Sequence, residues 1–168
     1  DGKIILNQND GMVVALDAKT GKKIWDVRNV DPKVGATNTN APHVIKDKIL
    51  TGCSGAEFGV RCFMAAYNLK DGSLAWKAYS TGPDAEVLIG KDFNKDTPLY
   101  SALSVYEDVN GGNKQGGSFK KIDTAKLKGG EKDLGIRTWL KPQAVKDGWQ
   151  HGGGSVWGWY PYDPKTNL

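Results

Sequence analysis

A single carboxylate stands in a stretch of small residues, "GCSGAEFGVR", at positions 52–61. Glu57 offers the hard oxygen ligation that Ca²⁺ or a similar cation prefers, and Ser54 adds a hydroxyl. Gly55 and Ala56 would let a flat ligand lie close to the backbone. One carboxylate does not make a metal site. From these residues alone we therefore favour a tight turn with a surface glutamate and keep metal ligation as the alternative.

A second stretch, "HGGGSVWGWYPYDP" at 151–164, also carries residues suited to binding. Three glycines come just before Ser155 and Trp157, and their conformational freedom allows a close approach of another group. An exposed tryptophan face is a stacking platform for an aromatic ligand. Core packing is the alternative interpretation of Trp157.

Two cysteines, Cys53 and Cys62, flank the first stretch. They do not form a metal motif, because the chain has no other cysteine and its two histidines, His43 and His151, lack ligand spacing. A disulfide across a hairpin is possible, but its geometric requirements are narrow. We favour two buried thiols.

An internal repeat indicates the elements that hold these residues. "VVALDAKTGKKIW" (Val13–Trp25) and "MAAYNLKDGSLAW" (Met64–Trp76) align without a gap. Each combines a small apolar strand, a turn that ends in glycine, and a tryptophan four residues beyond that glycine. Hairpins repeated at this period predict propeller blades, and we expect each tryptophan to pack against a neighbouring blade. A third, partial copy is expected around Asp163.

The repeat predicts the organisation of the chain. We expect residues 1–29 to end one blade, 40–80 to form a full four-stranded blade, and 155–168 to start the next. Residues 81–154 form an excursion that is too long for a simple turn. About two blades would leave open edges and faces, so we expect a portion of a larger ring, or a ring that another chain completes. Because the chain starts without Met, we expect a mature or internal segment.

Composition supports this interpretation and excludes two classes of partner. The chain has 168 residues, 39% of them hydrophobic and 25% charged, and its 22 glycines and six tryptophans favour turn-rich β structure. The net charge is +4, and the lysine-rich segment Lys120–Asp133 also contains acids, so we do not expect nucleic-acid binding. No apolar run approaches the ~20 residues that span a bilayer.

Taken together, these segments resemble a known family. "APHVIKDKILTGCSGAEFGVR" and "GGGSVWGWYPYDPKTNL" are similar to two signature segments of the large, catalytic subunit of pyrroloquinoline quinone-dependent methanol dehydrogenases of the calcium or lanthanide type. The tryptophan repeats resemble that family's docking motifs. The resemblance covers nearly the whole chain except about Val109–Gly135, which looks like an insertion. It implies an all-β fold that forms part of an eight-bladed propeller.

The resemblance also implies roles for individual residues. Glu57 matches the carboxylate that ligates the metal, Trp157 the indole that stacks on the quinone, and Thr39 a threonine that binds a quinone carboxylate. Ser155 stands where the family usually has threonine and keeps the hydroxyl. The implied cofactor-binding residues are Thr39, Ser54, Gly55, Ala56, Glu57, Ser155 and Trp157.

The implied activity is oxidation of methanol or another primary alcohol to an aldehyde in the periplasm, with electrons passing to a cytochrome c. In that family the cation polarises the quinone while an aspartate takes the alcohol proton. No residue of this chain matches that aspartate, the second metal ligand or the family's vicinal cysteine pair, so we expect no catalytic base within it. Calcium or lanthanide, and the exact alcohol, stay open.

The resemblance also implies partners: the rest of the propeller, together with a second copy or a small subunit. A non-catalytic propeller segment that serves binding or assembly is the alternative function. The pairing of Glu57 with Trp157 favours the enzyme, because a scaffold needs no acid in a small-residue cradle opposite a glycine-flanked tryptophan.

Overall fold

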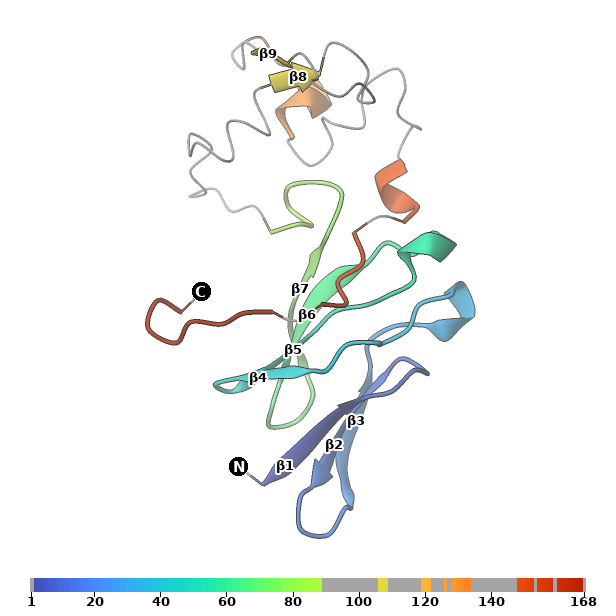
Figure 1. Ribbon diagram of the computed structural model, residues 1–168, viewed down its shortest axis with the longest axis vertical. Coiled ribbons are helices and arrows are strands. Elements are labelled where there is room, and N and C mark those ends of the chain that lie inside the picture. Colours follow the sequence, from blue (N-terminus) through green and yellow to red (C-terminus); the bar gives the residue numbers. More distant parts are fainter. Residues whose placement is uncertain are drawn as a thin grey trace. The chain divides into compact units, whose positions relative to one another are not determined.

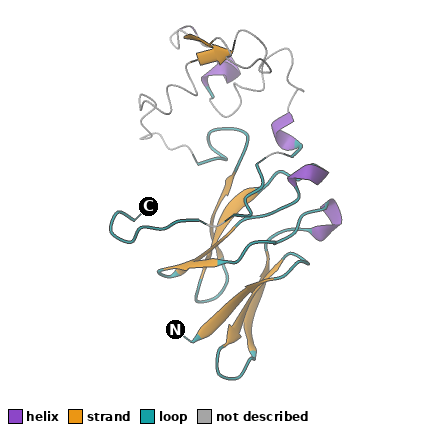
Figure 2. Cartoon of the chain, viewed as in Figure 1, coloured by secondary structure: helices purple, strands orange, loops and turns teal. Residues whose placement is uncertain are grey.

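The computed structural model describes residues 2–88, 106–108, 119–121, 126, 128–133, 148–152, 154–158 and 160–167 (Figures 1 and 2). The chain divides into two compact units, residues 1–81 with 149–168, and residues 82–148. The described elements are β-strands and short 3-10 turns, which confirms the predicted all-β class. Among these residues, no helix has the length and apolar character needed to cross a bilayer.

Two antiparallel sheets make up the larger unit (Figure 1). The first has the order β1-β2-β3, and its strands are β1 (Lys3–Asn7), β2 (Met12–Asp17) and β3 (Lys23–Arg28). The second has the order β4-β5-β6-β7, and its strands are β4 (His43–Ile45), β5 (Lys48–Thr51), β6 (Phe63–Asn68) and β7 (Leu74–Tyr79). Each strand therefore pairs with its neighbour in sequence, as in a meander.

The core lies on the inner strands of both sheets. Val13 and Ala15 of β2, Ile49 of β5 and Ala65 of β6 are fully buried. Small and β-branched side chains at these positions suit strands that pack on both faces. The tight connection between β4 and β5 places Lys46 at a φ of 54°, as two-residue hairpins require.

The sequence repeat corresponds to two hairpins of the same construction. In the first, the Gly21 N–H donates to the Asp17 carbonyl at 2.9 Å, and in the second the Gly72 N–H donates to the Asn68 carbonyl at 2.9 Å. Both glycines adopt positive φ, 68° and 74°, which explains their type. The strand register also shifts at equivalent positions in β2 and β6.

Trp25 of β3 docks on the second hairpin. Its indole Nε1 donates to the Leu69 carbonyl at 3.3 Å. A side chain at Gly72 would come within 2.7 Å of the Trp25 ring, so the indole lies directly over this turn. The expectation that Trp25 packs against the neighbouring sheet is confirmed. The equivalent Trp76 is 38% exposed.

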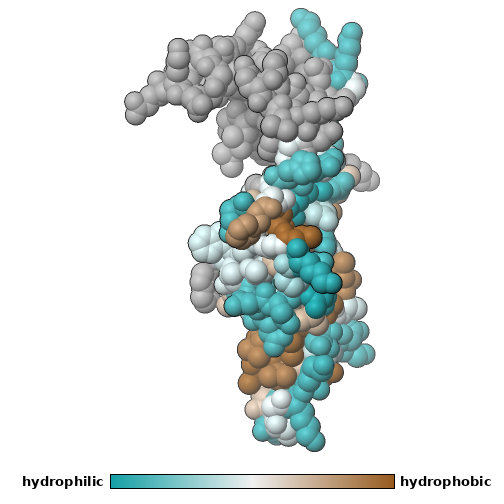
Figure 3. Space-filling model, turned by 90° about the vertical axis from the view of Figure 1, so that its right-hand side faces the viewer, coloured by the Kyte–Doolittle hydropathy of each residue, from teal (hydrophilic) through white to brown (hydrophobic). Residues whose placement is uncertain are grey.

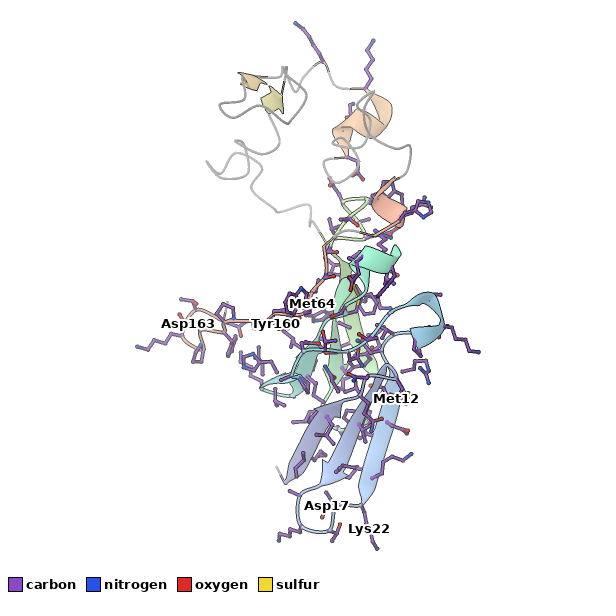
Figure 4. All side chains as sticks on the ribbon, turned by 45° about the vertical axis from the view of Figure 1, so that its right-hand side comes forward. Met12, Asp17, Lys22, Met64, Tyr160 and Asp163 are labelled. Carbon is purple, nitrogen blue, oxygen red and sulfur yellow. A yellow bond between two sulfur atoms is a disulfide. The ribbon has the colours of Figure 1, made fainter. Side chains whose placement is uncertain are left out.

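The third, partial copy is present as a turn. The Asn167 N–H donates to the Asp163 carbonyl at 2.8 Å, repeating the bond that closes the turn at Asp17. Figure 4 labels Asp17 and Asp163 in their two turns. Asn167 takes the position of Gly21 and adopts a φ of 59°; asparagine tolerates this left-handed region better than most residues.

Cys53 and Cys62 form a disulfide, so the interpretation as two thiols is wrong. Their Cα atoms are 5.5 Å apart, and both residues are fully buried. The intervening chain turns back through the 3-10 turn η2 (Ala56–Phe58), which returns Cys62 to Cys53. Sequence separation alone does not reveal this return.

The smaller unit contains a two-stranded antiparallel ribbon of β8 (Tyr106–Asp108) and β9 (Phe119–Lys121), and the 3-10 turn η4 (Gly129–Lys132). The Asp84 N–H donates to both carboxylate oxygens of Asp133, at 3.1 and 3.0 Å. Most of the proposed insertion, Val109–Gly135, lies outside the described residues.

Apolar side chains reach the surface of the larger unit, where Figure 3 shows apolar patches among polar residues. The exposed side chains of its strands include Ile4, Leu6, Ile24, Leu74 and Trp76, with exposures between 38% and 53%. Such faces are typical of sheets that pack against further structure.

Candidate functional site

One cavity brings together five of the seven residues predicted to bind the cofactor. It has a volume of about 430 Å³, and its lining consists of Thr39, Ser54, Glu57, Ser155 and Trp157. These residues come from three separate segments: the loop before β4, the loop between β5 and β6, and the chain near the C-terminus. The roles assigned to them stay predictions.

Two hydroxyls meet at one side of this cavity. Thr39 and Ser54 are joined by a hydrogen bond between their side-chain oxygens. The two loops are also paired by backbone bonds, from Thr37 N–H to the Ser54 carbonyl at 3.1 Å and from Ser54 N–H to the Thr37 carbonyl at 2.9 Å. These backbone hydrogen bonds hold the two loops together and so position the two hydroxyls.

Glu57 lies in η2, between two glycines with positive φ, Gly55 at 118° and Gly59 at 84°. The turn closes on itself through the Phe58 N–H, which donates to the Gly55 carbonyl at 2.9 Å. The side chain of Glu57 is exposed at the cavity. No hydrogen bond or ion pair within the described residues engages its carboxylate, so both oxygens are available to a ligand.

The segment near the C-terminus crosses the same loop. The Val156 N–H donates to the Cys53 carbonyl at 2.9 Å. The Ser155 hydroxyl accepts a long hydrogen bond of 3.4 Å from the Ala56 N–H. Trp157 is 63% exposed and lines the cavity, so core packing does not account for it.

Gly55 and Ala56 are not among the residues that line the cavity. Gly55 is buried, and a side chain there would collide with the Gly35 carbonyl. Gly52 is similar, because a side chain there would collide with the Val156 carbonyl. Close packing of protein segments therefore explains both glycines without a ligand.

A buried network of hydrogen-bonded side chains lies next to Thr39 of the cavity, and the sequence did not predict it. Asn38 and Asn40, on either side of Thr39, are only 2% and 8% exposed. Asn29 donates to the Asn38 side-chain oxygen at 2.8 Å and accepts from the Tyr67 hydroxyl at 2.8 Å. Burial raises the pKa of Tyr67 to about 12, so its hydroxyl stays a donor. The alternation Asn-Thr-Asn was the only signal in the sequence.

Tyr160 joins this network to the segment near the C-terminus (Figure 4). Its hydroxyl donates to the Val156 carbonyl at 2.7 Å and accepts from Asn40 at 3.3 Å. Burial raises the pKa of Tyr160, which favours the protonated hydroxyl. The Tyr160 hydroxyl thus links the neighbour of Thr39 to the neighbour of Trp157.

The cavity offers hydroxyls, one carboxylate and one indole face. The indole can stack on a flat aromatic ligand, the hydroxyls can hydrogen-bond to its polar groups, and the carboxylate can ligate a cation. Within the described parts of the chain, no three His, Cys, Asp or Glu side chains cluster to hold a metal ion. Glu57 would therefore be one ligand of a site that requires further oxygen donors.

A family model described as outer membrane protein assembly factor BamB matches residues 1–152. Subunit 1 of methanol dehydrogenase [cytochrome c] from Methylorubrum extorquens is 43% identical over the whole chain. The lanthanide-dependent methanol dehydrogenase of Methylacidiphilum fumariolicum is 41% identical, again over the whole chain. In both cases the match covers 22% of the relative, so the chain spans about a fifth of their length.

The fold is similar to that of a solved structure, a europium-containing methanol dehydrogenase. The TM-score is 0.69 at 39% identity, over 98% of this chain and 23% of that one. Together with the family model, this similarity identifies the two sheets as a portion of a β-propeller, as predicted.

Proposed function

We propose that the chain is part of a quinone-dependent alcohol dehydrogenase, because it belongs to the family whose model is described as outer membrane protein assembly factor BamB and is homologous to methanol dehydrogenase large subunits. The intact protein would oxidise methanol or another primary alcohol to the aldehyde. The observation that carries this proposal is the shared cavity of Thr39, Ser54, Glu57, Ser155 and Trp157.

The residues of this chain fit pyrroloquinoline quinone. Its flat ring system requires an aromatic face, and Trp157 presents an exposed indole at the cavity. Its carboxylates require donors, which the Ser155 hydroxyl and one hydroxyl of the Thr39–Ser54 pair can supply, because the other hydroxyl of that pair donates within it. Gly55 and Ala56 would act through the backbone turn that carries Glu57.

The cation beside the quinone would take Glu57 as a ligand. A carboxylate suits both Ca²⁺ and the similarly hard lanthanide ions. A carboxylate in the lining of the cavity would give the cation one anionic ligand. A relative that is lanthanide-dependent and one without that description are similarly identical to this chain, at 41% and 43%, so either ion is compatible with the proposal.

When bound, the quinone with its cation supplies a hydride acceptor for the alcohol carbon. This chain's own residues would bind and orient it: the indole of Trp157 would stack on the ring system, the hydroxyls would hydrogen-bond to its polar groups, and Glu57 would ligate the cation. We assign no catalytic base within this chain.

Three further properties belong to the proposal. Electrons would pass to a cytochrome c, which the name of the Methylorubrum extorquens relative includes. The intact protein would work in the periplasm. The remaining blades would come from the rest of the propeller, and a second copy or a small subunit would complete the assembly.

The alternative, a non-catalytic propeller segment for binding or assembly, accounts for the docked Trp25 but not for the cavity. A scaffold gains nothing from a carboxylate without a hydrogen bond or ion pair among the described residues beside an exposed indole.

The test is alcohol-dependent reduction of cytochrome c by the intact protein, loaded with pyrroloquinoline quinone and either Ca²⁺ or a lanthanide. We expect Glu57→Gln to lower the rate at least about 100-fold, because a neutral amide is a far weaker ligand for a hard cation. Glu86→Gln, at an exposed glutamate outside the cavity, is the matched control and should keep the rate. Full activity of Glu57→Gln would contradict the assignment.

A further inference from the structure

Arg61 connects the loop of Glu57 to the end of the second sheet. It lies four residues beyond Glu57 in the connection between β5 and β6. Its Nε and Nη2 atoms both donate to the Thr81 carbonyl, at 2.9 and 2.5 Å. Two bonds from one planar guanidinium to one oxygen fix its orientation.

The same guanidinium reaches the segment that leads to Trp157. Its Cζ atom lies 3.9 Å from the ring centroid of Tyr79 and 4.6 Å from that of Trp149. Both distances are within the range of cation–π attraction. The Thr81 hydroxyl also donates to the Trp149 carbonyl at 3.0 Å, so Arg61, Thr81 and Trp149 form one contact group.

From Trp149 the contact continues along the backbone toward the cavity. A side chain at Gly152 would come within 2.7 Å of the Ala56 carbonyl and 3.3 Å of the Gly59 Cα, so these segments touch. Ser155 then bonds to Ala56. A displacement of Trp149 would therefore reach both Glu57 and Trp157.

We propose that Arg61 is a positioning residue, which fastens the Trp149 segment to the Glu57 loop so that the Glu57 carboxylate and the Trp157 indole line the same cavity. Arg61 is not among the residues that line this cavity, so it acts through the loops. The identity of the ligand rests on the proposed function, whereas the contacts of Arg61 with Thr81 and Trp149 are independent of it.

Quinone affinity gives the first test. Pyrroloquinoline quinone is titrated into the intact, cofactor-free protein, and binding is followed by quenching of tryptophan fluorescence. We expect Arg61→Ala to raise the Kd about tenfold or more, because the hydrogen bonds to Thr81 and the cation–π contact with Trp149 are lost. Arg61→Lys should recover only part of the affinity, since an ammonium keeps the charge but not the planar fork.

Lys77→Ala provides the matched control. Lys77 lies on β7, and its Nζ atom is 3.9 Å from the Phe63 ring centroid, which is a cation–π contact on the same sheet. Its removal should lower the thermal midpoint and leave the quinone Kd within about twofold. If Arg61 served only the stability of the fold, Arg61→Ala would also lower the thermal midpoint and leave the quinone Kd within about twofold.

Amide hydrogen exchange gives a second test that needs no ligand. We expect Arg61→Ala to speed exchange in two separate segments at once, residues 54–61 and 149–157, and Lys77→Ala to leave both unchanged. Trp149→Leu should reproduce the pattern of Arg61→Ala. Unchanged exchange in either segment, or an unchanged quinone Kd, would overturn the role of Arg61. Failure of the wild-type protein to bind quinone would instead contradict the proposed function, and the exchange result would still decide the role of Arg61.

Discussion

Thr39 is placed at the cavity by its neighbours. The side chains of Asn38 and Asn40 turn into the protein, and each is hydrogen-bonded there, Asn38 to Asn29 and Asn40 to Tyr160. With both neighbours held inside the protein, the Thr39 side chain remains exposed. Its exposed hydroxyl then pairs with that of Ser54.

We predict that Tyr67→Phe destabilises the fold by about 1–3 kcal/mol at pH 8, because Asn29 is left with an unpaired buried oxygen. The pKa of Tyr67 is about 12 in the folded chain and about 10 when unfolded. The contribution of the Tyr67 hydroxyl to the free energy of unfolding is therefore complete below about pH 10 and is lost as the pH rises toward 12. Urea unfolding from pH 8 to 11 measures this difference, which should narrow above pH 10.

Tyr162→Phe is the control for this series. The Tyr162 hydroxyl donates to Asn167 in an exposed turn at 3.0 Å, so its loss should cost little and show no such pH trend. Equal losses for the two variants would mean that the buried network does not stabilise the fold.

At the residue scale, the sequence was informative where the chemistry is local. Glu57 and Trp157 were selected by type and by their glycine-rich surroundings, and both line the cavity. Arg61 and the asparagines were missed, because a hydrogen-bonded interior asparagine and a loop asparagine look alike in sequence. Gly55 was interpreted as ligand clearance, yet the adjacent backbone of Gly35 explains it.

The two repeated hairpins differ in what lies over their turns. The turn at Gly72 carries the Trp25 indole, whereas the space around the turn at Gly21 is open, with no atom within 4 Å of the Cβ that a side chain would add. The backbone of the two turns is otherwise equivalent. The pair therefore separates the effect of docking from the effect of the turn.

We predict that Gly72→Ala destabilises the fold by about 1–3 kcal/mol more than Gly21→Ala. Both variants place a Cβ at positive φ, at a cost of roughly 1–2 kcal/mol. Only at Gly72 would the new methyl meet the Trp25 ring, at 2.7 Å, and overpacking adds a similar amount. Urea or thermal unfolding of both variants gives the comparison. Equal destabilisation would mean that the Trp25 ring accommodates the methyl at no cost, which would contradict close packing of this indole on the turn.

At the element scale, the hairpins were predictable because their turn chemistry repeats in the sequence. The docking of Trp25 followed from the same repeat, since a small sheet cannot bury its own faces. The disulfide was not predictable, because pairing of Cys53 with Cys62 depends on how η2 returns the chain. The third turn was predictable from Asp163, although asparagine replaces the glycine there.

For the whole molecule, two observations indicate part of a larger propeller: the exposed apolar strand faces and the share of the relatives' length that the chain spans. The chain spans about a fifth of its methanol dehydrogenase relatives, and apolar side chains such as Leu74 and Trp76 are exposed on its outer strand. A propeller buries such faces between blades. The blade boundaries, at 1–29, 40–80 and 155–168, with the excursion 81–154, stay predictions, as does the ring of eight blades.

The most direct measurement of the central claim is quinone occupancy of the intact protein, read from its absorption spectrum after loading with pyrroloquinoline quinone and either Ca²⁺ or a lanthanide ion and removal of unbound cofactor. We predict about one quinone per catalytic subunit in the wild type, and occupancy at least about tenfold lower in Trp157→Ala. A wild-type protein without quinone absorption, or a Trp157→Ala variant with full occupancy, would contradict the claim that this cavity holds the cofactor.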